Sequence, residues 1–518
     1  MTGRPSSDAA AGTVEFTVNG APVSVPARGS LLDALREPLR LTGAKDGCSP
    51  QGQCGCCTVW VDGQPRVSCV TPVGRVRGRS VTTIEGLATG DAWADSFVRH
   101  GASQCGFCTP GIIMRAAALD ETKRCDPAAV GQSLLAHLCR CTGWQSVVDA
   151  IVDGPASDTD STPSPEASAL RAELEGRVPQ VVGPSVALGN GGFADDTAPA
   201  DALVALRNGA GEWVVAETLH NARELSGKVQ GRRTTAPLSW PIDVPPGEWE
   251  RTLQTTWVEP AYLEPDASWC EPGGEPMSSH GNGGAFGGKR SGELGSIARN
   301  LADRHGRPVR VLSTREDVVR RGPKRPPIGA GVRADGTGIV HVARADGIAE
   351  AITALAPSLD VVEVDVTGPP VSADLRGAGW VEAAVLLASL RDAADAAVTS
   401  PDGATARASI GDDGTVSVSV RCGAILDPTV LESYCVGAAH MALGWVTTEG
   451  LAVGDDGLPL DLTMRSFGVL RAVDTPTIDV TLLDDDGPPV NGSDAVFAAV
   501  ALAAWRRSGW APQWPTSR

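Results

Sequence analysis

The chain is organised around residues 46–58, which read Asp46-Gly47-Cys48-Ser49-Pro50-Gln51-Gly52-Gln53-Cys54-Gly55-Cys56-Cys57-Thr58. A second cysteine-rich stretch reads Gln104-Cys105-Gly106-Phe107-Cys108 and is completed by Leu138-Cys139-Arg140-Cys141-Thr142-Gly143. Ten of the 13 cysteines lie between positions 48 and 141. Such clustering in a chain of 518 residues indicates metal ligation rather than packing.

The first cysteine group has the spacing C-x5-C-x2-C…C. It consists of Cys48, Cys54 and Cys57 in a glycine-rich loop, and of Cys69 after an expected β-turn. Plant-type [2Fe–2S] ferredoxins use C-x4-C-x2-C…C, so this loop is one residue longer. The glycines let the backbone wrap closely and point N–H groups at sulfur. Cys56 is a fifth thiol, which we interpret as a small buried hydrophobic residue.

The second group combines a C-x2-C pair, Cys105 and Cys108, with a C-x-C pair, Cys139 and Cys141. Four thiolates near helix ends could hold zinc or a second [2Fe–2S] cluster, since thiolate geometry serves both. Disulfides are a third alternative, which a reducing cytoplasm disfavours. Cys125 lies between the two pairs and is interpreted, like Cys56, as a structural thiol.

Composition and charge exclude several classes of partner. The formal charge of −18 argues against nucleic acid. No apolar run approaches the length of a membrane span, so we expect no membrane association. Residues 1–12 lack the apolar core of a secretory signal, and we therefore expect a cytoplasmic location. The length is enough for several domains.

Residues 13–88 have the pattern of a β-grasp ferredoxin domain. Apolar residues alternate from Val14 to Val25 around an Asn19-Gly20 turn, which predicts a β-hairpin. Ser30 is expected to cap a short helix that starts at Leu31 and ends before Pro38. A second hairpin over residues 58–70 would place Cys69 next to the cysteine loop.

Residues 89–153 change to a helical period, which predicts a small helical bundle domain that carries both cysteine pairs of the second group. One helix is expected at Pro110 with Thr109 as its cap, and another from Pro127 to Leu138. A last helix is predicted over residues 144–152. Residues 154–168 are rich in Pro, Ser, Thr and Asp and predict a linker. Residues 169–518 have mixed α/β patterns, so the fold class is α+β.

Together, the two cysteine groups resemble the small iron–sulfur subunit of the xanthine dehydrogenase / aldehyde oxidoreductase family of molybdenum hydroxylases, over residues 13–153. The resemblance implies a ferredoxin-like domain, a helical domain and two [2Fe–2S] clusters. It implies metal ligands at Cys48, Cys54, Cys57 and Cys69 for one cluster, and at Cys105, Cys108, Cys139 and Cys141 for the other.

Short motifs in residues 169–518 are similar, in order, to the molybdopterin-binding subunit of the same family. They include Leu263-Glu264-Pro265, the loop Gly283–Lys289 and Arg376-Gly377-Ala378-Gly379. In the family the two loops flank the molybdenum, and the Gln before the C-x2-C pair approaches the pterin. The implied molybdopterin-contacting residues are Gln104, Gly283, Gly284, Phe286, Gly287 and Arg376. On its own, a glycine loop is equally typical of a flexible surface turn.

The resemblance has gaps in this region. It is shorter than the family's molybdenum subunit, lacks a Gly-Gln-Gly-x-x-Thr segment and is preceded by no FAD domain. The family's catalytic glutamate follows a Gly-x-Gly sequence, and one alignment register puts Gly487 there, whereas another puts Asp494 near it. We interpret Asp494 as the N-cap of a helix over residues 495–505; the alternative is a base on a shorter arm. No catalytic residue is assigned.

Two functions therefore remain open. The first is a molybdenum-hydroxylase-type oxidoreductase that passes electrons from a molybdopterin site through two [2Fe–2S] clusters to an external acceptor, such as a flavin subunit. Its implied substrate is a small aldehyde or N-heterocycle. The alternative is an iron–sulfur electron-transfer or assembly subunit without a working molybdenum site, which would dock a second molybdenum-binding chain.

Overall fold

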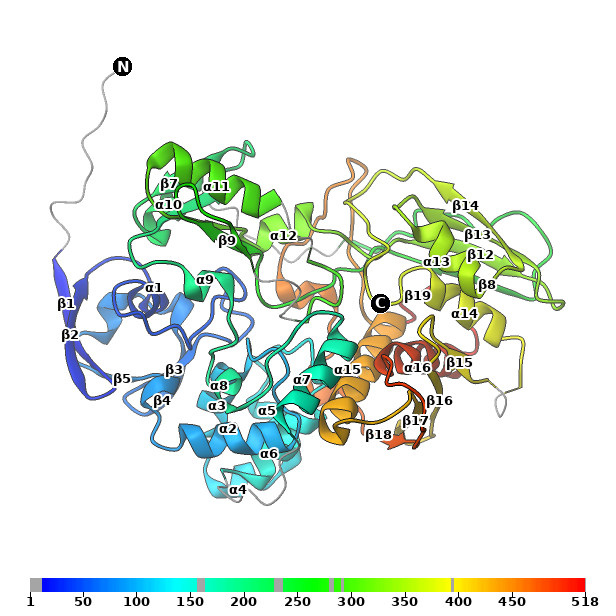
Figure 1. Ribbon diagram of the computed structural model, residues 1–518, viewed down its shortest axis with the longest axis horizontal. Helices are drawn as coiled ribbons and strands as arrows, with labels where there is room; N and C mark the ends of the chain where they lie inside the picture. The colour runs from blue at the N-terminus through cyan, green and yellow to red at the C-terminus, as the bar shows by residue number, and fades with distance from the viewer. Residues whose placement is uncertain are drawn as a thin grey trace.

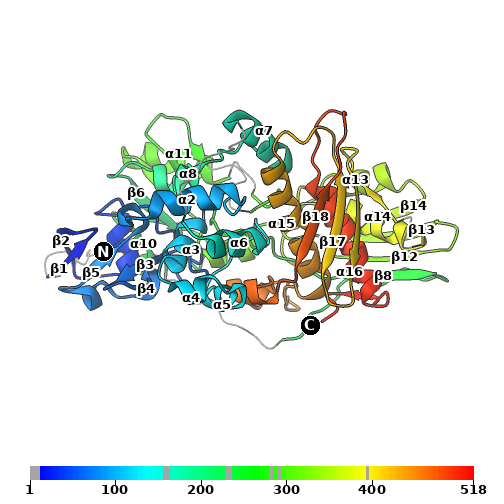
Figure 2. The ribbon, with the colours of Figure 1, turned by 90° about the horizontal axis from the view of Figure 1, so that it is seen from below.

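The computed structural model describes residues 12–155, 164–227, 236–278, 284–289, 293–392 and 396–517. Residues 12–155 lie on one side of helix α15 (Pro428–Thr447), which runs through the middle of the molecule, and the sheets formed around residues 328–364 and 398–421 lie on its other side (Figures 1 and 2). Most side chains of α15 are buried. This helix is therefore the packing surface that both halves share.

The first sheet has the strand order β2-β1-β5-β3-β4. Its strands are β1 (Thr13–Val18), β2 (Ala21–Pro26), β3 (Thr58–Val61), β4 (Gln64–Val67) and β5 (Ser80–Thr82). Asn19 and Gly20 both have positive φ values, 52° and 82°, as a two-residue hairpin turn of this kind requires. Helix α1 (Leu31–Arg36) begins at Ser30, which forms a capping box with Asp33. Both local predictions are confirmed.

A set of short helices follows the first sheet. They are α2 (Gly90–Arg99), α3 (Thr109–Ala116), α4 (Glu121–Arg124), α5 (Pro127–Ser133) and α6 (Gln145–Asp153). The prediction of a helix as far as Leu138 is wrong, because α5 ends at Ser133 and the Leu138 N–H donates to the Cys54 carbonyl instead. The prediction of Thr109 as a cap is also wrong: Cys108 is the N-cap, and the Thr109 hydroxyl lies 3.1 Å from that of Ser103.

A second sheet, β10-β9-β11-β6-β7, starts the C-terminal part. Its strands are β6 (Leu203–Arg207), β7 (Trp213–Ala216), β9 (Ala267–Cys270), β10 (Met277–Ser278) and β11 (Val309–Leu312). Leu203 and Ala205 of β6 pack with α11 (Glu293–His305), whereas Val204 and Leu206 pack with α10 (Leu219–Ser226). This alternation places one helix on each face, as the two-residue period of a strand requires.

Two further sheets and their helices form the rest of the described chain. The third sheet has the order β14-β13-β12-β8-β19 and the fourth β15-β16-β17-β18. Their strands are β8 (Arg251–Thr255), β12 (Ile328–Val332), β13 (Gly338–Ala343), β14 (Leu359–Val364), β15 (Val398–Thr399), β16 (Thr405–Ile410), β17 (Val416–Arg421), β18 (Ile478–Leu482) and β19 (Gln513–Trp514). The accompanying helices are α12 (Arg315–Arg321), α13 (Ile348–Leu355), α14 (Trp380–Ala388) and α16 (Ser493–Arg507).

Helix α7 (Pro165–Gly176) connects the two parts and packs against α15. It begins inside the predicted linker, with Ser164 as its N-cap, so the last residues of that range are helical. The short helices α8 (Pro184–Ala187) and α9 (Ala194–Thr197) follow it. None of the described helices has the combination of length and apolar character that crossing a bilayer requires.

Candidate functional site

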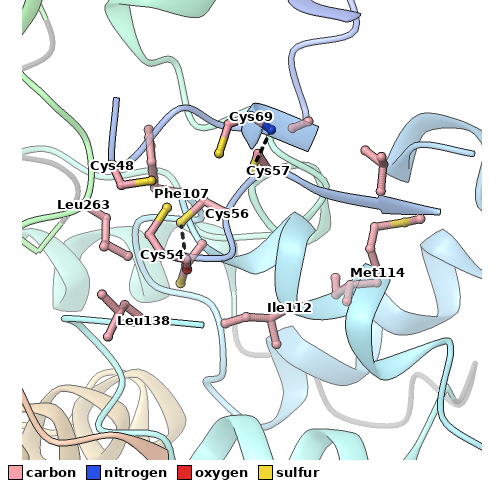
Figure 3. Packing of buried hydrophobic residues seen from close by; sticks show 14 of the residues in the cluster. Cys48, Cys54, Cys56, Cys57, Cys69, Phe107, Ile112, Met114, Leu138 and Leu263 are labelled. Atoms are coloured by element: carbon pink, nitrogen blue, oxygen red, sulfur yellow. Dashed lines mark hydrogen bonds between the residues drawn. The ribbon is translucent and has the colours of Figure 1, made fainter. Parts of the chain in front are cut away.

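The first predicted quartet, Cys48, Cys54, Cys57 and Cys69, is buried, with no more than 5% of any of these side chains exposed. Three of these cysteines lie in the loop before β3, and Cys69 lies on a 3-10 turn after β4. Figure 3 shows them together with Cys56 and Phe107 in one buried cluster. Hydrogen bonds with the Cys54 and Cys69 thiols lower the pKa of Cys48. The thiols of this quartet therefore contact one another and favour a thiolate at Cys48.

The loop of this quartet depends on close backbone approach. A Cβ atom on Gly47 would lie 3.2 Å from the Cys54 sulfur. Gly55 has a φ of +73°, and a Cβ there would lie 2.5 Å from the ring of His137. Backbone N–H groups also point at sulfur, since Gln51 donates to Cys48 Sγ over 3.1 Å. These are the features that an enclosed iron–sulfur site requires.

The second predicted quartet, Cys105, Cys108, Cys139 and Cys141, is equally enclosed. The Sγ atoms of Cys105 and Cys141 are 3.6 Å apart. Hydrogen bonds with the thiols of Cys108 and then Cys141 lower the pKa of Cys139. Four buried thiols in mutual contact are a donor set that suits an iron–sulfur cluster.

A single backbone hydrogen bond joins the two quartets. The Leu138 N–H donates to the Cys54 carbonyl over 3.0 Å, so a residue next to Cys139 contacts a member of the first quartet.

The Cys56 thiol donates to the same carbonyl over 3.7 Å and is fully buried. Cys125 is exposed. In the described residues no three His, Cys, Asp or Glu side chains converge on one ion position. A [2Fe–2S] cluster does not require this, because each of its irons takes two protein thiolates.

The predicted pterin-facing residues lie next to the second quartet. Gln104 Nε2 donates to the Cys141 carbonyl over 3.2 Å and to Ser433 Oγ over 2.9 Å, while its Oε1 is buried without a hydrogen-bond partner. A Cβ on Gly284 would lie 3.1 Å from the Cys141 sulfur. The structure therefore brings Gln104 and Gly284 to the quartet. Gly283 lies outside the described residues.

Arg376 is tied to the glycine loop by its backbone and its side chain. Its N–H donates to the Phe286 carbonyl over 2.9 Å, and its guanidinium lies 3.8 Å from the centre of the Phe286 ring. Gly287, with φ of +91°, has no space for a Cβ, which would lie 1.7 Å from the Asp374 carbonyl oxygen. The loops around Gly287 and Arg376 are thus packed against each other.

Asp494 is a partner of Arg376 and not a helix cap. Its Oδ1 accepts from Arg376 Nε over 2.9 Å, and its Oδ2 accepts from Arg177 over 2.7 Å. The interpretation of Asp494 as the N-cap is wrong, because Gly492 holds that position and Asn491 Oδ1 accepts from the Asp494 N–H. No local sequence pattern indicated Arg177 as a partner, since it lies 317 residues away.

A cavity of about 560 Å³ borders these loops. Its walls include Phe286, Gly287, Trp380, Arg376 and Asp494. This volume lies within the range of small-molecule sites. The cavity is therefore a space where an organic ligand would meet Phe286, Gly287 and Arg376, whereas Gln104 and Gly284 do not line it.

Arg140 and Glu449 form a buried ion pair between the second quartet and the C-terminal region, which the sequence did not indicate. Arg140 lies between two of the predicted ligands, Cys139 and Cys141. It donates to both carboxylate oxygens of Glu449, over 2.6 and 2.7 Å, and to the Pro260 carbonyl over 2.9 Å. Both side chains are at most 5% exposed. This bidentate pair fixes the second quartet to the residues that follow α15.

Comparison with known proteins gives the family of this arrangement. Residues 11–84 match the model of a 2Fe–2S iron–sulfur cluster binding domain, and residues 83–152 match that of a [2Fe–2S] binding domain. The chain is 42% identical over 147 residues to the nicotine 6-hydroxylase small subunit of Paenarthrobacter nicotinovorans. The matched region covers 27% of this chain and 88% of that protein. It is 38% identical over 148 residues to the xanthine dehydrogenase iron–sulfur-binding subunit of Escherichia coli O157:H7, covering 92% of that protein.

The longer relatives extend the likeness to the fold of the whole chain. An aldehyde oxidoreductase of Megalodesulfovibrio gigas is 39% identical over 173 residues, which is 19% of that protein. The solved aldehyde oxidoreductase from Desulfovibrio gigas superposes with a TM-score of 0.68 at 15% identity, over 95% of this chain and 97% of that one. At that identity the superposition shows a shared fold. The chain belongs to the xanthine dehydrogenase / aldehyde oxidoreductase family of molybdenum hydroxylases and is an electron-transferring oxidoreductase of that type.

Proposed function

We propose that this chain holds one [2Fe–2S] cluster at Cys48, Cys54, Cys57 and Cys69, and another at Cys105, Cys108, Cys139 and Cys141. The clusters supply one-electron transfer, and the chain relays electrons to an external acceptor in the cytoplasm. The observation that carries the proposal is the pair of buried thiol sets, which share no member and are joined by the hydrogen bond from Leu138 to Cys54.

The chain's own part is to hold, shield and orient the clusters. Burial of all eight thiols excludes water, and a dry environment with N–H donors tunes the potential of an iron–sulfur site. Glycine at positions 47 and 284 leaves room for the sulfur atoms of Cys54 and Cys141, and glycine at position 55 leaves room for the His137 ring. In this family the acceptor is a flavin subunit or another redox protein, and the relatives named as small subunits support partner chains here as well.

The residues beside the second quartet fit a molybdopterin in part. Gln104 has a buried acceptor without a partner, and a pterin ring carries N–H donors that such an atom binds. We propose that Gln104, Gly284, Phe286, Gly287 and Arg376 would hold the cofactor, with Gly283 as their neighbour in sequence. Bound there, it would supply the two-electron oxidation of a small aldehyde or N-heterocycle at the cavity of about 560 Å³.

A specific observation favours a second candidate. The Arg376 guanidinium already donates to Asp494 and to Ser493 Oγ, over 2.9 and 2.8 Å, and is stacked on Phe286. An arginine that is satisfied in this way has few donors left for a ligand. The second candidate is therefore an electron-transfer or assembly subunit, with molybdenum held by another chain.

Metal analysis of the purified full-length chain tests both candidates. We expect about four iron atoms per chain, two for each cluster, and two distinct [2Fe–2S] signals in EPR spectra after reduction with dithionite. Molybdenum at about one atom per chain supports the first candidate, whereas iron without molybdenum supports the second. Zinc in place of half of the iron would contradict the assignment of the second quartet. Cys125→Ser, at an exposed thiol, is the matched control and should leave the metal content unchanged.

A further inference from the structure

The loop of the first quartet is held by residues that lie far along the chain. Gln51 Oε1 accepts from the Met464 N–H over 3.3 Å, and Gln53 Oε1 accepts from the Arg465 N–H over 3.2 Å. Gln51 Nε2 also donates to Glu316 Oε1 over 3.0 Å. The surroundings of this quartet are therefore completed by the C-terminal region, whether or not that region binds molybdenum.

Arg315, the first residue of α12, brings a charged side chain from the C-terminal region into contact with this loop. Its Nη2 donates to the Gly47 carbonyl over 2.8 Å, and its Nε donates to the same oxygen over 3.2 Å. Nη2 also donates to the Leu263 carbonyl over 2.8 Å. Gly47 directly precedes Cys48, so the guanidinium lies one residue from a predicted ligand.

The side chain of Arg315 is shielded from solvent and donates no hydrogen bond to a carboxylate, although the Asp266 carboxyl lies near enough to interact with its charge. Its side chain is 0% exposed, and Nη1 has no hydrogen-bond partner. The hydrogen bonds that the other two nitrogens form go to neutral carbonyl oxygens. A buried cation of this kind is costly unless an anion offsets it. A [2Fe–2S] cluster with four thiolates is net negative, and gains one further negative charge on reduction.

We propose that Arg315 is a positioning residue whose buried charge raises the reduction potential of the cluster at Cys48, Cys54, Cys57 and Cys69. The inference rests on the proposed presence of that cluster. Because the reduced cluster is the more negative form, a fixed positive charge nearby stabilises it more than the oxidised form. Glu316 is its neighbour of opposite sign. It contacts the Gln51 side chain rather than the backbone next to Cys48, and so opposes the effect weakly.

The sign of the two charges gives a test that lost packing alone does not mimic. Arg315→Gln should make the midpoint potential of the first cluster more negative by about 59 mV. For one electron this is a tenfold change in the ratio of reduced to oxidised cluster. Glu316→Gln should shift the same midpoint in the positive direction and by less. Arg315→Lys keeps the charge and should remain near the wild-type value. Arg321→Gln, an exposed arginine on the same helix, is the control and should change nothing.

The measurement is a dithionite titration of the full-length, iron-loaded protein, followed by EPR, with the second cluster as an internal reference. Opposite shifts at Arg315 and Glu316 that leave the second cluster unchanged support the proposal. Shifts of the same sign, equal shifts of both clusters, or no shift overturn it. If Arg315→Gln does not retain the first cluster, Arg315→Lys decides: a loaded cluster at the wild-type potential supports the charge, and a lost or shifted cluster refutes it. Failure of the proposed function is distinguishable, because wild-type protein would then bind no iron at this quartet.

Discussion

The two quartets are both buried, yet the rest of the chain holds them in different ways. The loop of the first is bound from outside by side chains of the C-terminal region, including Arg315 and Glu316. The second is fixed by Arg140 of its own ligand segment, which forms a bidentate pair with Glu449 beyond α15. The difference teaches that the first quartet depends on charged side chains supplied by a remote region, whereas the second is anchored by an arginine within its own ligand segment.

The largest expected effect removes one quartet and leaves the other. Cys139→Ser should reduce the iron content from about four to about two atoms per chain and abolish one EPR signal, because the ligand sets share no member. Iron analysis and EPR of the dithionite-reduced protein check this. Cys56→Ala is the matched control, at a buried thiol that we do not assign as a ligand, and should keep both signals. Loss of both signals from Cys139→Ser would break the comparison.

The next largest effect is expected from loss of the ion pair between Arg140 and Glu449, which anchors the second quartet. Glu449→Gln leaves the Arg140 guanidinium buried without its carboxylate, which should lower the free energy of unfolding by about 3–5 kcal/mol. The second EPR signal should weaken before the first. Urea unfolding, followed by fluorescence, measures the stability. The control is Asp365→Asn, which removes an exposed partner of Arg344 and should cost less than about 1 kcal/mol.

A smaller effect tests the junction that both quartets share. Gly55→Ala places a methyl group 2.5 Å from the His137 ring and 2.7 Å from the Ala136 carbonyl oxygen, which should destabilise the protein by about 1–3 kcal/mol beyond the strain of a positive φ. Gly63→Ala is a close match, because Gly63 has a similar φ of +72° but open space around it. Equal unfolding midpoints in urea for the two variants would contradict the close approach.

The smallest expected effect is a pH dependence of the free energy of unfolding that comes from a histidine near the second quartet. Burial lowers the pKa of His440 on α15 from 6.5 to about 4. Since the unfolded chain takes up this proton at higher pH than the folded one, stability should fall as pH decreases from 6.5 towards 4, by about 1.4 kcal/mol per pH unit. Urea midpoints at pH 7 and 5.5 check this. His440→Leu should flatten the slope. His137, whose pKa is also lowered by burial to about 4, accounts for a remaining slope.

Local sequence patterns predicted the first part of the fold well. The Asn19-Gly20 turn and the Ser30 cap depend on residues within a few positions of each other, and such patterns are visible in a single sequence. The end of α5 was not predictable in this way. It is set by a hydrogen bond between Leu138 and Cys54, which lie on different segments, so tertiary contact overrides the helical pattern.

The same limit applies to the candidate site. The cysteine spacing predicted two sets of thiols, because ligands of one cluster lie close in sequence. Asp494 was interpreted from its position before an apolar helix, and that local reasoning failed because its partners, Arg376 and Arg177, lie 118 and 317 residues away. Arg315 and Glu449 were missed for the same reason: each contacts a cysteine loop that is remote along the chain.

The contact between Gln53 and Arg465 spans 412 positions of the chain, and this has a consequence for biosynthesis. At the usual pace of translation, about 5–20 residues per second, roughly 20–80 s pass between the emergence of these two residues from the ribosome. For that time the thiols of the nascent first loop lack the cover that the finished protein gives them. The time for which this loop stays uncovered is therefore set by the synthesis of the 412 positions that separate the two partners, and slow codons anywhere in that span would lengthen it.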